Sequence, residues 1–314
     1  LQYGPETESR RCESFSQLFD QFFAEKDHLE RVRQRGQDLI QTVTSARDRA
    51  ARKLNRQRQE LAATAGRELL RQQGDIITSN LYQMERGQTV LQAENYYDPE
   101  GGQIAIPLDP LLSPQQNAAH YYKRYNKAKT AEAVLTVQID KGEQELDYLN
   151  SVLELIKLAE GERDLQEIRQ ELAGYLRRPK KAAKREKPVT GRPMEFRSSA
   201  GLRISVGKNN SQNDRLTTKL AGKNDLWLHT QKIHGSHVIL WTEGQPPDAQ
   251  SLGEAAALAA WFSQARESKK VPVDYTPVKY VKKPAGARPG MVVYTTYQTA
   301  YVDPDGDLAQ RLRI

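Results

Sequence analysis

Cysteine is almost absent from this chain, since Cys12 is the only one among 314 residues. A single thiol cannot form an intrachain disulfide or a cysteine-based metal cluster, so we expect a reducing compartment, the cytoplasm. Long apolar runs are absent too: no stretch of eighteen or more apolar residues occurs, which excludes a membrane-spanning helix. Only 38% of the residues are hydrophobic. A single globule of this length needs more of them, so part of the chain should be elongated and solvated.

Acidic residues are outnumbered by basic ones, 40 to 47, which gives a formal net charge of +7. That balance favours a polyanionic partner, and charge alone leaves nucleic acid and an acidic membrane surface both open. The first residue is Leu rather than Met, so we interpret the chain as a piece of a longer protein. The lack of a signal peptide is therefore weak evidence about location.

Two helical arms are predicted over residues 15–176. Residues 15–70 contain no proline, and their apolar side chains recur at spacings of three and four, at Leu29, Val32, Leu39, Val43, Ala46, Ala50, Leu54, Leu61, Ala65 and Leu69. The second arm opens with a capping box, Ser113-Pro114-Gln115-Gln116. Its heptad positions are Ala128, Leu135, Ile139, Leu146, Leu149, Leu153 and Ile156. Together these patterns predict a long antiparallel coiled-coil hairpin.

A small module of different character lies between the arms, at about residues 74–112. Thr89–Tyr97 and Gln103–Leu108 have strand-like composition, and residues 98–102 (DPEGG) form a strong turn signal. The order of the elements places this module at the tip of the hairpin. Asn95, Tyr96 and Tyr97 are candidates for an exposed contact with a partner, and the alternative is that they form the core of the module itself.

A second domain is predicted after a basic linker. Residues 162–176 are expected to form one more short helix, and residues 177–193 are rich in Lys, Arg and Pro, which opposes packing. Residues 194–314 then alternate short strand-like runs, among them 275–281, 291–295 and 299–302, with one helix. Ser251-Leu252-Gly253-Glu254 is interpreted as a capping box that opens this helix, Ala255 to Arg266. The fold class is therefore α+β: a helical hairpin with a β-containing tip module, followed by a compact α+β domain.

Three histidines, His229, His234 and His237, lie close together in the second domain. Three histidines can hold a catalytic zinc ion, but no acidic residue stands in a metallohydrolase spacing such as H-E-x-x-H. The neighbouring Thr, Gln, Gly and Ser residues suit hydrogen bonds to sugar or phosphate. Metal binding, contact with nucleic acid and an ordinary structural role all remain open.

Three basic segments are candidates for contact with a polyanion. Lys208, Asn209 and Asn210 follow a glycine and precede a helix-like run, where unpaired amides can hold a phosphate, or where an Asn simply caps the helix. Residues 279–290 interleave Lys and Arg with Tyr and two prolines. The first arm carries Arg47, Arg49, Arg52, Lys53, Arg56 and Arg58 with few acids between them. Trp227 and Trp261 are interpreted as core residues rather than stacking platforms.

No catalytic constellation stands out. Cys12 is far in sequence from the histidines, the serines near His237 show no G-x-S-x-G motif, and no carboxylate pair resembles that of a glycosidase. We therefore expect no enzymatic activity and no cofactor.

Several motifs in the same order make the chain similar to the NFACT family over nearly its whole length. In the second domain they are residues 206–210 (VGKNN), 213–220 (NDRLTTKL), 225–229 (DLWLH), 235–238 (GSHV), 273–276 (VDYT) and 282–290 (KKPAGARPG). Upstream they are residues 80–82 (NLY), 95–97 (NYY), 106–110 (IPLDP) and 125–127 (YNK). The family's large N-terminal domain has no counterpart here, and residues 4–23 resemble only its trailing edge.

The resemblance implies a role in ribosome-associated quality control. Members of the family bind a large ribosomal subunit obstructed by peptidyl-tRNA and recruit charged tRNA for template-free tailing, with alanine in bacteria. The expected partners are ribosomal RNA, a protein of the stalk base and tRNA, without a membrane. The candidate RNA-binding residues are Arg47, Arg49, Arg52, Lys53, Arg56, Arg58, Lys208, Asn209, Asn210, Arg215, Lys219, His229, His234, His237, Lys279, Lys282, Lys283 and Arg288, and the ribosome-contacting tip is Asn95, Tyr96 and Tyr97. The alternatives are a fibronectin-binding adhesin and a metal-dependent hydrolase.

Overall fold

The computed structural model describes residues 14–176 and 191–314, which fall into two compact units. Unit 1 comprises Leu1–Arg47 and Asp147–Ile314, and unit 2 comprises Asp48–Leu146. Two long helices, α1 (Phe15–Ala62) and α3 (Pro114–Lys157), contribute residues to both. Residues 1–13, in the predicted trailing edge of the family's N-terminal domain, and residues 177–190 of the predicted linker lie outside the described residues. Within those residues, no helix combines the length and the apolar character that crossing a bilayer requires.

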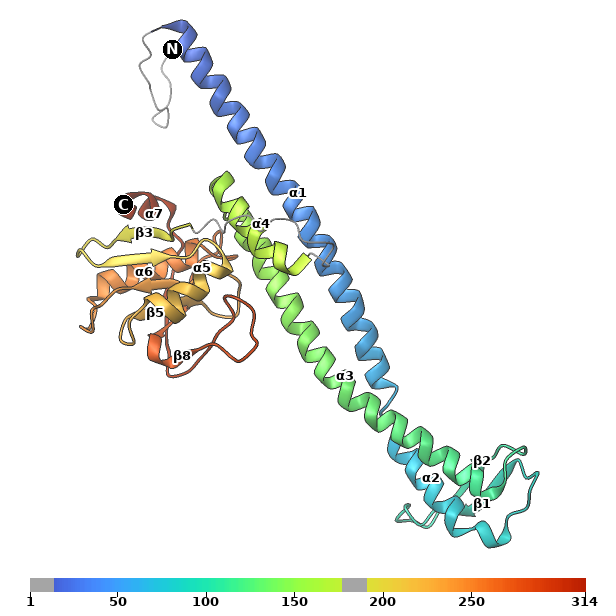
Figure 1. The fold of residues 1–314 in the computed structure, drawn as a ribbon. Helices are drawn as coiled ribbons and strands as arrows, with labels where there is room; N and C mark the ends of the chain where they lie inside the picture. The colour runs from blue at the N-terminus through green and yellow to red at the C-terminus, as the bar shows by residue number, and fades with distance from the viewer. Residues whose placement is uncertain (1–13, 177–190) are drawn as a thin grey trace. The chain divides into compact units, whose positions relative to one another are not determined.

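In unit 2 the two arms run antiparallel, as predicted (Figure 1). Ala50 and Leu54 of α1 are buried, and Leu54 packs closely over Gly142 of α3, where a Cβ would lie 3.2 Å from its side chain. The amide of Gln57 donates to Gln138 over 2.6 Å, and Arg58 pairs with Glu143 over 2.6 Å. The predicted seam positions Leu39, Val43 and Ala46, which belong to unit 1, are buried as well.

The predicted apolar stripe ends earlier than its spacing suggests. α1 stops at Ala62, and a turn separates it from α2 (Arg67–Ser79). Ala65 is exposed and Leu69 is 49% exposed, so the prediction that they continue the seam is wrong. The Thr64 hydroxyl donates to the Leu61 carbonyl, and Gly66 follows. Both features favour a turn over a continued helix.

The start of α3 confirms the predicted capping box. The Gln116 amide donates to the Ser113 hydroxyl over 3.2 Å, and the Ser113 amide donates to the Gln116 side-chain oxygen over 2.8 Å. Pro114 occupies the first helical position, where its missing N–H costs nothing. This local chemistry sets the residue at which the second arm begins.

The module between the arms is a β-hairpin packed on helices. β1 (Val90–Glu94) pairs antiparallel with β2 (Gln103–Pro107), which confirms both predicted strands with slightly shorter bounds. A short helical turn, η1 (Leu81–Gln83), precedes β1. The core of the module holds Ile76, Ile77, Leu91, Ala93, Ile106, Leu108, Ala118 and Tyr121.

Asp75 of α2 joins the elements of this module. Its carboxylate accepts hydrogen bonds of 2.6 Å from Tyr97 and 2.6 Å from Tyr122, and Arg71 lies 3.1 Å away. Partial burial alone would raise the pKa of Asp75, but the two tyrosine hydroxyls and Arg71 outweigh it, so the pKa lies below its ordinary value. Tyr97 is therefore part of the module's own structure, while Tyr96 stays 51% exposed.

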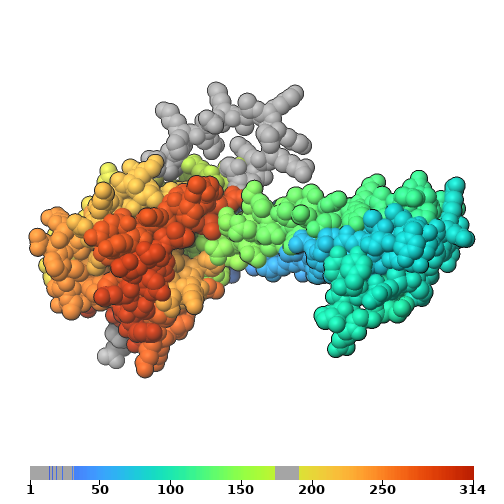
Figure 2. Space-filling view, turned by 90° about the horizontal axis from the view of Figure 1, so that it is seen from below, coloured from blue at the N-terminus to red at the C-terminus, as the bar shows by residue number. Residues whose placement is uncertain are grey.

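The α+β domain of unit 1 is built on a six-stranded antiparallel sheet in the order β10-β7-β5-β6-β4-β3. The strands are β3 (Met194–Arg197), β4 (Arg203–Val206), β5 (Leu226–Thr230), β6 (Val238–Leu240), β7 (Val271–Pro277) and β10 (Gln298–Val302). A short turn, η3 (Val278–Tyr280), leads into a two-stranded ribbon, β8 (Val281–Lys282) with β9 (Val293–Tyr294). Figure 2 shows the surface of this domain in yellow to red.

Both faces of the sheet are covered. Helices α6 (Ala249–Trp261) and α7 (Gly306–Leu312) bury one face, where alanines of α6 let it pack closely on Leu228, Val238 and Val273. Helix α5 (Asn210–Arg215), a π-helical turn (Leu216–Leu220) and the β8–β9 ribbon cover the other, over Trp227 and Ile239. Trp227 is 1% exposed, which confirms its interpretation as a core residue.

The start of α6 differs from the prediction. Asp248, not Ser251, is the N-cap, because its carboxylate accepts from the Ser251 amide over 2.7 Å. The helix begins at Ala249 and ends at Trp261, so both predicted ends are wrong. Glu254 does not close a capping box; it accepts hydrogen bonds from the amide and hydroxyl of Ser199. Two side chains able to cap a helix stand three residues apart here, and the first of them does so.

The α4 helix (Glu162–Leu176) confirms the short helix predicted over residues 162–176 and packs against α1 within unit 1. Arg35 of α1 forms an ion pair with Glu162. Leu39 and Leu165 line a shared cleft of about 670 Å³. Helix α4 thus connects the first arm to the part of unit 1 that holds the sheet.

Asp75→Asn should weaken unit 2 by about 1–2 kcal/mol at pH 7, because hydrogen bonds to a charged acceptor are lost. A carboxylate with a lowered pKa stabilises the fold above its unfolded pKa of about 3.9, and this contribution is lost as pH falls toward the folded value. The variant should lack that acid-dependent loss. Urea unfolding followed by circular dichroism between pH 7 and pH 3 measures both effects, with Glu94→Gln, at an exposed position of β1, as control. Equal acid dependence of Asp75→Asn and the unmodified chain would contradict the assignment.

Candidate nucleic-acid interface

The predicted arginine stripe presents one exposed cationic face on α1 in unit 2. Arg49, Arg52 and Lys53 are spaced by three and four residues, so they share a side of the helix. All three are exposed, and none has an acidic partner among the described residues. Arg56 lies 3.7 Å from Glu60, and Arg58 pairs with Glu143. Arg47, the remaining member of the stripe, belongs to unit 1 and is half-buried.

Two of the predicted histidines are packed beneath the β8–β9 ribbon. The ring centroids of His229 and His237 lie 5.6 Å and 5.3 Å from that of Trp227, and the Tyr294 ring lies 4.8 Å from the same indole. His237 is 3% exposed, and its Nδ1 lies 2.8 Å from the Thr217 hydroxyl. These side chains therefore take part in the packing of the domain.

Burial keeps these two imidazoles neutral. It lowers the pKa of His229 to about 4 and that of His237 to about 3. A neighbouring imidazole disfavours the charge further, His234 for His229 and His229 for His237. Neither side chain attracts phosphate by charge at pH 7. His234 is half-buried, 3.7 Å from Asp147. In the residues that the structure describes, no three His, Cys, Asp or Glu side chains are placed to share a metal ion.

The predicted phosphate-binding segment is occupied by carboxylates of α4. Lys208 pairs with Asp164 over 3.0 Å. The Asn209 amide donates to Glu167 over 3.1 Å. Asn209 also caps α5, accepting from the Gln212 amide, which agrees with the interpretation of this segment as a helix cap.

Glu171 completes this contact at the N-terminus of α5. It accepts from the amide and the hydroxyl of Ser211, at 2.8 Å and 3.0 Å, and from the Tyr148 hydroxyl. Burial raises the pKa of Glu171 and of Glu167, although these hydrogen bonds favour the charged forms. The positive end of α5 is therefore satisfied within unit 1.

The basic loop of residues 282–290 packs against α5. Lys283 pairs with Asp214 over 2.7 Å, and the Arg288 guanidinium lies 5.3 Å from the centre of the Tyr148 ring. Gly290 has φ of 77° and packs so closely on Asn210 that a Cβ would lie 2.6 Å from its side-chain oxygen. Asn210 itself donates to Ser151 over 3.0 Å.

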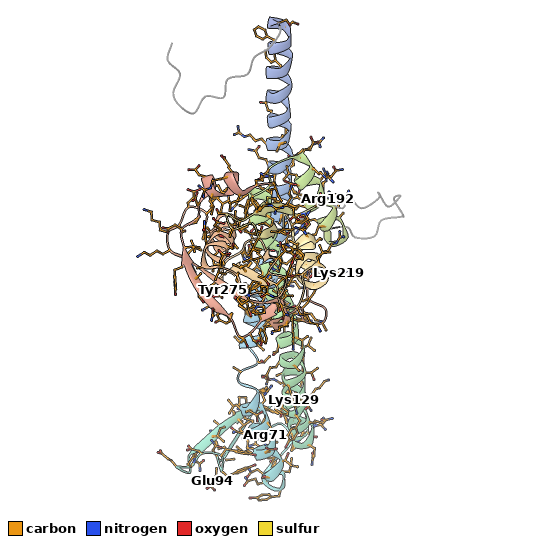
Figure 3. The ribbon with its side chains drawn as sticks, turned by 90° about the vertical axis from the view of Figure 1, so that its left-hand side faces the viewer. Arg71, Glu94, Lys129, Arg192, Lys219 and Tyr275 are labelled. Carbon is orange, nitrogen blue, oxygen red and sulfur yellow. The ribbon has the colours of Figure 1, made fainter. Side chains whose placement is uncertain are left out.

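The remaining predicted residues lie on the surface. Arg215 and Lys219 are exposed on the α5 side of the domain, and Lys279 and Lys282 are exposed near the ribbon. Figure 3 labels Lys219 and Tyr275 on opposite sides of this domain. The structure thus groups the candidates of unit 1 by setting: Lys208–Asn210 with Lys283 and Arg288 around α5, the packed histidines His229 and His237, and the exposed surface cations. Except for Arg47, the stripe of α1 lies in unit 2.

Sequence reasoning missed the acidic face of α4. Asp164, Glu167 and Glu171 are spaced by three and four residues, so they lie on one side of the helix. The available signal was an acidic stripe that precedes a basic domain in the sequence. The residues that pair with this stripe lie some forty residues further along the chain. Reasoning also missed Arg203, whose guanidinium lies 4.8 Å from the centre of the Trp241 ring.

Comparison with known proteins gives consistent matches along the chain. Residues 1–188 match the family described as NFACT N-terminal and middle domains, and residues 192–295 match the NFACT protein RNA binding domain. The protein named Rqc2 homolog RqcH of Bacillus subtilis (strain 168) is 40% identical over 309 residues, covering 98% of this chain and 54% of that protein. The protein of that name from Streptococcus suis (strain 05ZYH33) is 39% identical over 307 residues, covering 96% and 54%. The chain thus spans about half the length of these curated relatives.

A solved structure shares the fold. It is the C-terminal part of the fibronectin/fibrinogen-binding protein from Streptococcus suis, which aligns with a TM-score of 0.71 at 36% identity. The alignment covers 91% of this chain and 100% of that one. The aligned residues of this chain therefore include the helical arms as well as the α+β domain.

The two buried histidines should make the α+β domain sensitive to mild acid. Because the folded pKa lies below the unfolded value of about 6.5, their contribution is complete above pH 6.5 and falls as pH drops toward the folded pKa. At pH 5, the lowered pKa of His237 alone should reduce the free energy of unfolding by about 2 kcal/mol relative to neutral pH. Urea unfolding followed by tryptophan fluorescence at pH 7.5 and pH 5 measures the difference, and His237→Gln should reduce it. A His237 proton resonance that titrates near pH 6.5 would contradict the burial.

Proposed function

The chain belongs to the NFACT family, and on that premise we propose that it is part of a ribosome-associated quality-control factor. Together with the rest of the protein it binds an obstructed large ribosomal subunit and tRNA. There it supports recruitment of charged tRNA for template-free tailing of the stalled peptide with alanine. The names of its relatives and the match of its second domain to an RNA-binding family support this role.

The proposal assigns the chain a binding role rather than a catalytic one. Peptide transfer belongs to the ribosome, so the chain positions RNA and needs no cofactor of its own. The site of action is the cytoplasm. The exposed ring of Tyr96, with the neighbouring turn at Asn95, is the part of the module proposed to contact a protein of the stalk base.

The exposed cations of α1 carry the proposal. Arg49, Arg52 and Lys53 stand on one helix face without acidic partners among the described residues, whereas the next two arginines of this helix have such partners. Three unpaired charges within little more than one turn suit phosphates along an RNA backbone. Their free energy of binding comes mainly from release of counterions, so it must depend on salt.

Replacing Arg49, Arg52 and Lys53 together by Gln should weaken RNA binding and flatten its salt dependence. Each lost phosphate contact lowers the log–log slope by about 0.7–0.9, so the triple variant should lose about 2–2.7 of the slope. Cosedimentation with large ribosomal subunits over a series of salt concentrations measures it.

The matched control is Asn55→Ala with Gln59→Ala, two exposed neutral positions on the same helix. This pair changes the surface of α1 without changing its charge, and it should leave affinity and slope as they are. A triple variant whose slope equals that of the unmodified chain would remove α1 from the interface.

A fibronectin-binding adhesin is the second candidate. It is favoured by the solved structure that shares this fold, because that structure is described as part of a fibronectin/fibrinogen-binding protein. The same cationic face would attract an acidic glycoprotein without specific pockets. Fibronectin binding that persists in the triple variant, when RNA binding is lost, would support the adhesin. Loss of both together would mark fibronectin binding as general attraction between opposite charges.

A further inference from the structure

A groove opens at one end of the sheet in unit 1, beside the start of α6. Its volume is about 440 Å³, within the range of ligand-binding clefts. Its walls include two aromatic rings, Tyr275 of β7 and Tyr280 of η3, and two prolines, Pro247 and Pro277. Such a lining offers flat apolar faces rather than a deep pocket for an aliphatic chain.

One polar group in the groove is placed to contact a ligand. Gln298 of β10 accepts a hydrogen bond of 2.5 Å from the Tyr275 hydroxyl through its side-chain oxygen. This bond fixes the orientation of the amide, whose nitrogen has no partner among the described residues. A donor of this kind, held beside an aromatic ring, suits the acceptor atoms on the edge of a planar heterocycle.

The groove lies beside a group of exposed lysines. The Lys279 ammonium is 5.2 Å from the centre of the Tyr280 ring, and its backbone amide donates to the Lys223 carbonyl over 3.0 Å. Lys282 follows in β8, and in the described residues none of the three has an acidic partner. Three acids adjoin lining residues along the chain, Asp225, Asp248 and Asp274. Asp225 and Asp274 are buried, and all three carboxylates already accept hydrogen bonds, from Gly222, Ser251 and Tyr294 respectively among others.

We propose that this groove holds a base of single-stranded RNA against Tyr275 and Tyr280, with the adjoining phosphates near Lys223, Lys279 and Lys282. The inference rests on the RNA-binding function proposed above and assigns it a second, base-stacking site. Aromatic faces beside unpaired cations are the combination that single-stranded nucleic acid uses. A duplex keeps its bases stacked inside, so it can reach the lysines but not the rings. A proline-rich peptide would use the rings and leave the three positive charges without partners, so the charges favour RNA.

The test is fluorescence anisotropy of the full chain with two labelled probes, a single-stranded oligouridylate and an RNA duplex of equal length. Tyr280→Ala should weaken binding of the single strand roughly 5- to 150-fold, the loss expected for one base–aromatic stack, with the salt slope unchanged. Binding of the duplex should change little. Tyr280→Phe keeps the ring and should retain the affinity for the single strand.

Two matched controls separate the groove from the rest of the surface. Tyr301→Ala removes a tyrosine that is 73% exposed on β10 of the same sheet but does not line the groove, and it should have no effect. Lys282→Gln should lower the salt slope by about 0.7, whereas Lys269→Gln, at the other end of β7, should not. Thermal unfolding of each variant shows whether the fold is kept.

The outcomes distinguish this inference from the proposed function. If the unmodified chain binds neither probe in a salt-dependent way, the RNA-binding function itself fails. If it binds both probes and Tyr280→Ala binds the single strand as tightly as the unmodified chain does, the groove inference alone is overturned. Loss of affinity for a proline-rich peptide in Tyr280→Ala, without loss for RNA, would assign the groove to a peptide and overturn it too.

Discussion

The hydrogen bonds between the acidic face of α4 and the start of α5 connect the helical and the sheet-containing parts of unit 1. Asp164, Glu167 and Glu171 meet a lysine, two side-chain amides and a backbone amide that would otherwise be left unsatisfied. The cost is desolvation of the carboxylates, seen in the raised pKa values of Glu167 and Glu171. Because burying one partner without the other is expensive, the contact is specific for this pairing of helices.

That contact divides the positive charges of the chain into two kinds. Around α5 and the 282–290 loop, Lys208 and Lys283 already have carboxylate partners, so an RNA phosphate has to compete for them. On the exposed face of α1 and beside the groove, Arg49, Arg52, Lys53 and the three lysines have no such partners among the described residues. The net charge of the chain does not distinguish paired from unpaired cations, although binding of a polyanion depends on the unpaired ones.

Local signals were predictable from sequence, and long-range contacts were not. The Ser113 capping box and the two strands around the 98–102 turn follow from residues within a few positions of one another. The same rule failed at Ser251, where Asp248 offered an equally good cap one turn earlier. The histidines were found as a group, but the neutrality of His229 and His237 depends on the β8–β9 ribbon that covers the second face of the sheet, and Tyr294 of that ribbon lies 57 residues beyond His237. The alternation of residues along a strand does not reveal that another element packs on the second face of the sheet.

The positions of the tryptophans have a spectroscopic consequence. All three, Trp227, Trp241 and Trp261, lie in the α+β domain, and unit 2 contains none. Trp227 is enclosed by imidazoles, while the other two indoles each face a guanidinium, of Arg203 and of Arg266. Selectively excited tryptophan emission from this protein therefore reports on the sheet-containing domain alone. Melting of the arms and their β-hairpin module is silent in that signal and visible in far-ultraviolet dichroism.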